Sequence, residues 1–190
     1  MANLCSSCGN VPTTESNVKN LILVLVLFAA PATLAQQPPV SSPLLDHLAG
    51  KWLMEGTIAG QPTKHDIDAQ WVLDHHYLRI HELSREKKAN GQPQYEAMVF
   101  IAWNEQPKHY SCAWLDVYGG FSVGSIGLAP PSDNELAFVF KNDKGEPDFS
   151  NDFAYDPKTD TWSDSLDNIV NGARKPFGRV KLSRRQALRN

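Results

Sequence analysis

The chain has 190 residues and a formal net charge of −3 at pH 7, and its charges are unevenly distributed. Seven basic residues and no acid lie between positions 174 and 189, but they are interleaved with predicted strand residues, so we expect no binding to nucleic acid.

Cys112 is the only cysteine after position 35, which excludes a disulfide scaffold, and a lone strand cysteine is usually a small buried hydrophobic residue.

Residues 1–35 have the features of an export signal. Lys19 precedes the apolar run 21–30, and Ala35, with Thr33 two positions before it, suits cleavage by signal peptidase. The run is shorter than the about 20 residues that a bilayer-spanning helix needs, so we expect no stable membrane insertion after cleavage, with a retained anchor as the alternative. We therefore expect an exported protein, either periplasmic or extracellular.

Residues 1–17 are long and polar for the start of a signal peptide, and translation from near Val18 is one explanation. The segment contains Cys5 and Cys8, but a single Cys-x-x-Cys pair cannot complete a tetrahedral zinc shell, and we assign it no function. Residues 36–42, rich in proline and serine, are predicted to be a flexible lead-in. Residues 43–190 have the size of one domain.

This domain is predicted to begin with a short helix, because Pro43 suits a first turn, Leu44, Leu45 and Leu48 line one side, and Gly50 suits a stop. Short strands follow, separated by turn residues such as Asn-Gly at positions 90–91. The strands are expected at 51–58, 66–73, 76–84, 95–103, 109–118, 121–127, 135–140, 148–155, 161–169 and 176–183.

The spacing of these strands leaves no room for crossover helices. Short connections favour an antiparallel up-and-down order, and closure of the sheet removes its exposed edges. The prediction is an all-β, antiparallel up-and-down barrel of about 8–10 strands with a short N-terminal helix that plugs one end.

Gly50-Lys51-Trp52, at the start of the first strand, resembles the Gly-x-Trp signature of lipocalins and their calycin relatives. The resemblance implies a basic residue of the last strand over Trp52, for which Arg179 and Arg184 are the candidates. We assign that structural role to Arg179. Nearly the whole mature chain resembles an uncharacterised lipocalin-like family of exported bacterial proteins, which implies a fold and no particular chemistry. The similar segments are Leu48–Trp52, Trp71–Arg79, Tyr95–Ala97, Trp114–Gly120 and Phe153–Pro157.

Strand parity separates residues onto two faces, and one face of the strand 109–118 combines aromatic side chains with a carboxylate. Such a mixture is typical of a ligand cavity. We therefore expect Trp114 and Asp116 to point inward, with Trp71, Arg79 and His81 as further ligand contacts. The alternative is that Arg79 and Asp116 form only a structural ion pair and that aromatic residues fill the barrel.

The polar residues do not have the spacing of a metal site or a known catalytic motif. His75 and His76 are adjacent and so point to opposite faces of a strand, whereas zinc needs three or four convergent ligands. We expect no metal and no cofactor. An enzyme is not favoured, because no recognised catalytic motif occurs, although His81 approaching Asp116 from another strand would form a general base.

The leading interpretation is an exported barrel that binds a small hydrophobic or amphipathic ligand in its interior. A small hydrolase or isomerase that uses His81 and Asp116 is one alternative. A filled barrel with a structural or interaction role is another, because both faces of the strand around residues 97–101 are apolar and need cover. The helix or a partner subunit would supply that cover, which leaves a homodimer open.

Overall fold

The computed structural model describes residues 42–185. The predicted export signal, the Cys-x-x-Cys pair and the lead-in up to residue 41 lie outside the described residues. Within this range one helix, α1 (Pro43–Leu48), precedes the sheet, and one 3₁₀ turn, η1 (Val123–Ser125), precedes the sixth strand. The strands are β1 (Gly50–Ile58), β2 (Gln61–Val72), β3 (Tyr77–Ser84), β4 (Glu96–Glu105), β5 (Lys108–Asp116), β6 (Ile126–Ala129), β7 (Glu135–Lys141), β8 (Pro147–Asp156), β9 (Thr161–Val170) and β10 (Ala173–Arg184).

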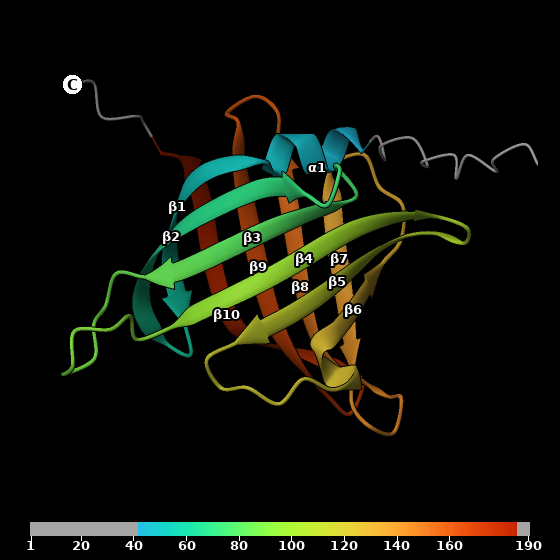
Figure 1. The fold of residues 1–190 in the computed structure, drawn as a ribbon. Helices are drawn as coiled ribbons and strands as arrows, with labels where there is room; N and C mark the ends of the chain where they lie inside the picture. The colour runs from blue at the N-terminus through green and yellow to red at the C-terminus, as the bar shows by residue number, and fades with distance from the viewer. Residues whose placement is uncertain (1–41, 186–190) are drawn as a thin grey trace, which may run out of the picture. The chain divides into compact units, whose positions relative to one another are not determined.

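The ten strands form one closed barrel in which each strand pairs antiparallel with the next in sequence. β1 pairs with β10 and so closes the ring, with Trp52 opposite Arg184 and Ile58 opposite Gly178. The prediction of an all-β, up-and-down barrel with a short N-terminal helix is confirmed (Figure 1).

The sixth strand is the element whose predicted position differs most from the structure. It was expected at 121–127, but β6 begins at Ile126 and η1 precedes it. The Ser122 hydroxyl accepts a hydrogen bond from the Gly124 amide, while the Ser125 hydroxyl accepts one from the Ser122 amide. This reciprocal capping satisfies the backbone locally and favours a helical turn over an extended strand.

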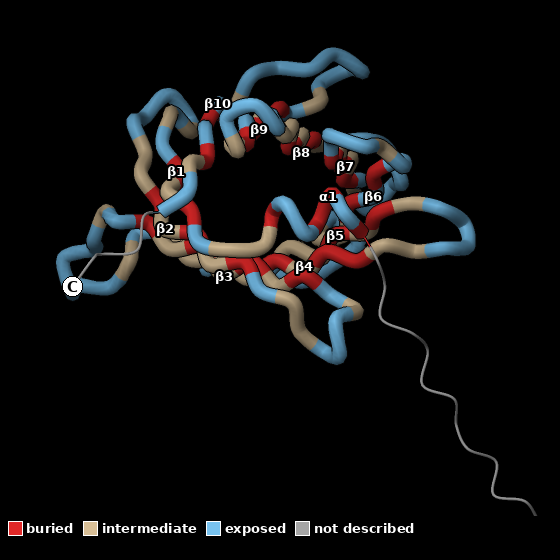
Figure 2. The backbone as a smooth tube through the Cα atoms, turned by 90° about the horizontal axis from the view of Figure 1, so that it is seen from above, coloured by how far each residue is buried: buried red, intermediate tan, exposed pale blue. Residues whose placement is uncertain are grey.

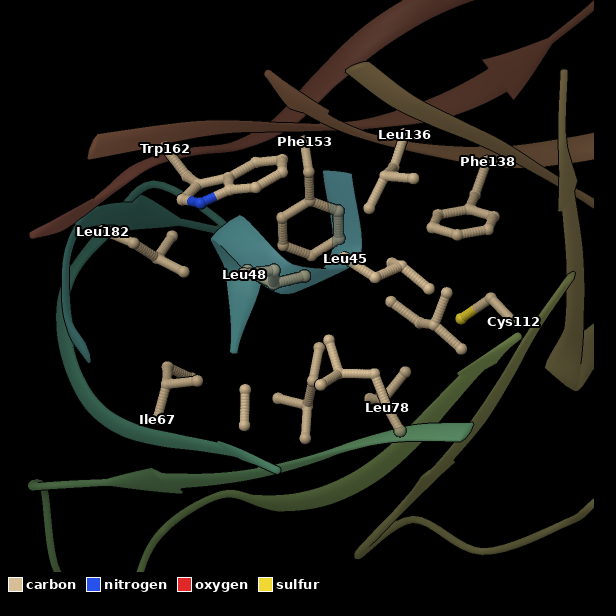
Figure 3. Close-up of a cluster of buried hydrophobic side chains, with 14 of the residues drawn as sticks. Leu45, Leu48, Ile67, Leu78, Cys112, Leu136, Phe138, Phe153, Trp162 and Leu182 are labelled. Atoms are coloured by element: carbon tan, nitrogen blue, oxygen red, sulfur yellow. The ribbon is translucent and has the colours of Figure 1, made fainter. Parts of the chain in front are cut away.

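Inward-facing residues alternate with outward-facing ones along the strands, so the buried positions recur around the ring (Figure 2). At the α1 end the interior is packed solid (Figure 3). Leu45 and Leu48 of α1 are fully buried there, against Trp162, Phe153 and other side chains of the strands. The helix therefore plugs one end of the barrel, as its apolar side predicts.

Arg184 is the basic residue that lies over Trp52, with its guanidinium carbon 3.8 Å from the ring centroid. The same guanidinium donates hydrogen bonds to the carbonyls of Ala49 at 2.6 Å and His47 at 3.0 Å, and so caps the end of α1. The Trp52 indole N–H donates to the Leu48 carbonyl at 2.7 Å. One cation and one indole thus tie the last strand, the first strand and the helix together.

The assignment of this role to Arg179 is wrong. Arg179 has the opposite parity to Arg184 on β10, and it donates to Asp167 at 2.6 Å on the outer side of the sheet. Gly50 of the Gly-x-Trp motif is explained by Arg184 as well. Its φ is +128°, a backbone conformation that favours glycine, and a Cβ atom there would displace the Arg184 guanidinium from its position over Trp52.

Candidate functional site

The half of the barrel away from α1 is hollow. A cavity of about 820 Å³ lies there, within the size range of small-molecule sites. Its mouth is formed by the loops that follow β1, β3 and β5, which contribute Ala59, Glu86 and residues 118–121. Tyr118 and Phe121 at this rim are 83% and 65% exposed. The wall below them is largely apolar and includes Ile58, Phe140, Phe149, Leu166 and Phe177.

A chain of hydrogen bonds fixes the aromatic side of the wall. The Trp114 indole N–H donates to the Tyr95 hydroxyl at 3.0 Å, and that hydroxyl donates to the Asp116 carboxylate at 3.3 Å. Burial is the largest of the effects that raise the pKa of Tyr95, so its phenol stays neutral and keeps the proton that it donates. The second carboxylate oxygen of Asp116 accepts from the Tyr118 amide at 2.9 Å, which holds the start of the rim loop.

Four residues form the floor of the cavity: Met54, Glu82, Trp114 and Asp164. They also line a smaller cavity of about 20 Å³ on the α1 side, which places them between the hollow half and the packed half. Asp164 is 4% exposed. Burial raises the pKa of Asp164 well above that of an exposed aspartate, the nearby charges of Glu82 and Asp152 raise it further, and Arg179 opposes them.

His65 is buried beside this floor and contacts two polar side chains. Its Nδ1 lies 2.5 Å from Glu82 Oε1, and its Nε2 lies 2.7 Å from Thr63 Oγ1. The Tyr95 ring stacks on the imidazole with a centroid separation of 5.7 Å. Thr63 and His65 are two positions apart on β2, and Glu82 of β3, which pairs with Ile67, is the diagonal neighbour of His65, so the three side chains lie in a row.

Two further oxygens at the inner part of the cavity lack a hydrogen-bond partner among the described residues. They are Asn151 Oδ1 and Asp164 Oδ1, both fully shielded from solvent. Phe153 pairs with Asp164 and Asn151 pairs with Leu166, which makes Asn151 and Asp164 diagonal neighbours on β8 and β9. Buried acceptors of this kind are costly when unpaired, which makes them candidates for contact with a bound molecule.

The structure brings together two of the residues predicted for the site. Trp114 and Asp116 line the cavity, as their shared face predicts. Trp71 lies at the α1 end instead, where its indole N–H donates to Asp46 at 2.9 Å and its ring stacks on His75.

Arg79 and His81 do not lie beside Trp114 and Asp116, which corrects the expected placement. The inward face of β3 carries Leu78, Ile80, Glu82 and Ser84, all of which are buried. Arg79 and His81 have the opposite parity and point outward, and His81 Nε2 lies 2.8 Å from Glu96 Oε1. Arg79 was expected inside the barrel because it could pair with Asp116. The apolar residues Leu78 and Ile80 determine instead which face of β3 points inward.

The sequence interpretation missed His65, Glu82, Asn151 and Asp164. For two of them a signal is present in the sequence. Glu82 continues the apolar series of Leu78 and Ile80, and Asp164 lies between Trp162 and Leu166 on one strand face. A carboxylate inside an otherwise apolar series indicates either a buried pair or a site.

Within residues 42–185, no group of three or more His, Cys, Asp or Glu side chains is arranged to hold a metal ion. Burial raises the pKa of the Cys112 thiol, so this cysteine is a packed side chain and a poor nucleophile. In the same described segment, no helix is long and apolar enough to cross a membrane.

The closed antiparallel barrel is compatible with a calycin-like fold. No protein-family model matches the chain, and no curated protein matches its sequence.

Proposed function

We propose that the protein is an exported, lipocalin-like barrel that binds a small, largely apolar ligand reversibly in its interior. The observation that carries this proposal is the cavity of about 820 Å³ in the half of the barrel opposite α1. A packed floor, an apolar wall and a loop-lined mouth are the parts that a binding site for a small molecule needs.

The chemistry of the wall and of the rim supports an apolar ligand. Phe140, Phe149 and Phe177 lie close together along one side, with ring centroids 5.9 to 6.2 Å apart between neighbours. Burying apolar ligand surface against such a wall contributes about 25 cal/mol for each Å² removed from water. Exposed Tyr118 and Phe121 at the mouth add an apolar surface that an approaching ligand contacts first.

The same proposal includes that the protein belongs to the lipocalin-like barrels and that it is exported. The position of Arg184 over Trp52, behind Gly50, supports the resemblance to the Gly-x-Trp barrels. Export is supported by the apolar run 21–30 and by the small residue Ala35. Detection of a processed form that begins at Gln36 would test the export step.

Binding is tested by titration of the protein with N-phenyl-1-naphthylamine, a neutral fluorophore that brightens in apolar surroundings. We expect a saturable rise in fluorescence. Met54→Trp places an indole on the cavity floor and should weaken this binding by about tenfold or more, because the indole displaces ligand volume. Leu53→Trp, which adds the same group to the outer face of β1, is the matched control and should bind as the wild type does.

Ester hydrolysis is a second candidate function, favoured by the row formed by Thr63, His65 and Glu82. In this reaction the Thr63 hydroxyl attacks the ester carbonyl, His65 takes the hydroxyl proton and returns it to the leaving alcohol, and water then releases the acyl group. His81 lies outside the cavity, so His81 and Asp116 are not placed for the corresponding reaction.

A panel of p-nitrophenyl esters tests this candidate. Hydrolysis that Thr63→Val and His65→Ala abolish, and that His81→Ala leaves intact, would establish it. Hydrolysis that is no faster than in buffer, or is unchanged in Thr63→Val, would remove it and leave binding as the function.

A further inference from the structure

Nearly all of the acidic and basic side chains that line the cavity are carboxylic acids. They are Glu82, Glu86, Asp116 and Asp164, and they are accompanied by one imidazole, that of His65. No lysine or arginine is among the lining side chains in the part of the chain that the structure describes. A low-dielectric cleft lined by one sign of charge concentrates ligands of the opposite sign, and so this cavity favours cations over anions.

The inner part of the cavity adds a second, independent observation. Asn151 is 1% exposed and Asp164 is 4% exposed, and the Oδ1 atom of each lacks a partner within the described chain. The amide oxygen of Asn151 is an acceptor, and so is the Asp164 oxygen once the carboxyl is ionised; the two residues lie on neighbouring strands and line the same cavity. A group that carries several N–H donors and no acceptor matches this pair best, and an ammonium group has three such donors.

We propose that the ligand is an amphipathic organic amine, bound as its ammonium ion, with the charged nitrogen at Asn151 and Asp164 and the apolar part along the aromatic wall. This inference rests on the proposed function, ligand binding in the cavity, and adds the chemical class of the ligand to it.

The surroundings offset the cost of taking an ammonium group out of water. Glu82 supplies a carboxylate at the same floor, which attracts a cation, and Trp114 supplies an aromatic side chain beside it. Glu86 and Asp116 lie nearer the mouth and favour approach of a cation along the cavity. A carboxylate ligand would be repelled by the carboxylates of Glu82, Glu86 and Asp116. An alcohol has a single O–H donor and would leave one of the two buried oxygens, on Asn151 or Asp164, without a partner.

Amine binding also has a consequence for protons. The groups that act on Asp164 are Glu82 from β3, Asp152 from β8 and Arg179 from β10, and His65 of β2 contacts Glu82. Together with burial, the two carboxylates keep the proton on Asp164 at pH values where an exposed aspartate has lost it. An ammonium ion next to Asp164 lowers its pKa again, so the complex releases a proton when it forms.

The test compares three probes of matched shape: 4-phenylbutylamine, 4-phenylbutanol and 5-phenylpentanoate. Each is titrated into the protein by isothermal titration calorimetry at pH 7, in phosphate and in Tris, because the difference in heat between buffers counts the protons released. We expect the amine to bind at least about tenfold more tightly than the alcohol, the carboxylate to bind most weakly, and proton release to accompany the amine alone.

Asp164→Asn keeps the side-chain shape and removes the acid. It should abolish both proton release and the preference for the amine over the alcohol. Asp68→Asn, at a half-buried position on the outer face of β2, is the matched control and should retain both proton release and the preference for the amine.

Alcohol binding as tight as amine binding, or an unchanged preference in Asp164→Asn, would overturn the amine assignment alone. Failure of all three probes and of the neutral fluorophore would overturn ligand binding in the cavity as well.

Discussion

Asp164 and Arg184 lie on the inward-facing sides of their strands, but Asp164 is buried in the barrel, whereas Arg184 is exposed at the barrel end. Arg184 has partners for its guanidinium, including Asp160, whose pKa is lowered chiefly by its hydrogen bond to Arg184. Asp164 is buried and forms no salt bridge with any described residue, and burial raises its pKa. Arg184 therefore stabilises the fold, whereas the burial of Asp164 lowers the free energy of unfolding, a cost that selection for stability alone would remove.

Asp164→Asn should make the free energy of unfolding less dependent on pH. Because the pKa of Asp164 is higher in the folded than in the unfolded state, the folded protein binds the extra proton between those two pKa values, and wild-type stability falls as the pH rises. Each pH unit in that interval costs about 1.4 kcal/mol. Urea unfolding at pH 4, 6 and 8 should show that the free energy of unfolding of the variant, relative to that of the wild type, increases with pH. A difference between the two proteins that stays constant with pH would contradict this account.

Arg184→Met should lower the free energy of unfolding by about 2 kcal/mol, because it removes the cation over Trp52 and charged hydrogen bonds to two helix carbonyls. Lys181→Met, an exposed position on the same strand, is the control and should change stability by less than about 0.5 kcal/mol. Equal effects in urea unfolding would mean that the cation does not join the helix to the barrel.

At the scale of elements, α1 is a six-residue plug whose stability comes from packing. A helix this short does not form by itself, so the burial of Leu44, Leu45 and Leu48 in the barrel end holds it in place. The hydroxyl of Ser42 accepts from the Leu45 amide and caps its start. The plug and the cavity therefore occupy opposite halves of the barrel.

Leu45→Ala should cost about 2–5 kcal/mol of unfolding free energy, since the side chain is fully buried and its removal leaves a void. Binding of N-phenyl-1-naphthylamine should change little, because Leu45 does not line the cavity. Leu128→Ala, on the exposed face of β6, should affect neither property. A loss of probe affinity in Leu45→Ala comparable with that of Met54→Trp would show that plug and cavity are not independent.

The order of the strands is predictable from the sequence because each strand is bounded by turn residues, and short connections leave few ways to arrange neighbours. Which face of a strand points into the barrel is harder to predict when both faces carry polar and apolar residues. In β3 the polar residues Arg79 and His81 suggested a site, although Leu78 and Ile80 pointed the other way. His65, Asn151 and Asp164 come from three separate strands, and only closure of the barrel brings them to one cavity.

At the scale of the whole molecule, one end of the barrel is packed and the other is hollow. Ten strands enclose a wider interior than the eight that side chains alone can fill, so additional volume remains after the core at α1 is complete. The aromatic wall, the acidic floor and the exposed rim all belong to the hollow half. The packed half supplies stability, and the hollow half is the part that we propose for ligand binding.

Native mass spectrometry of the protein purified gently from its own host tests the central claim, ligand binding in the cavity, most directly. The account predicts a bound small molecule on the wild type and on Leu53→Trp, and its loss from Met54→Trp, in which an indole occupies the cavity floor. A small molecule retained to the same extent by Met54→Trp would contradict the account, because the ligand would then bind elsewhere.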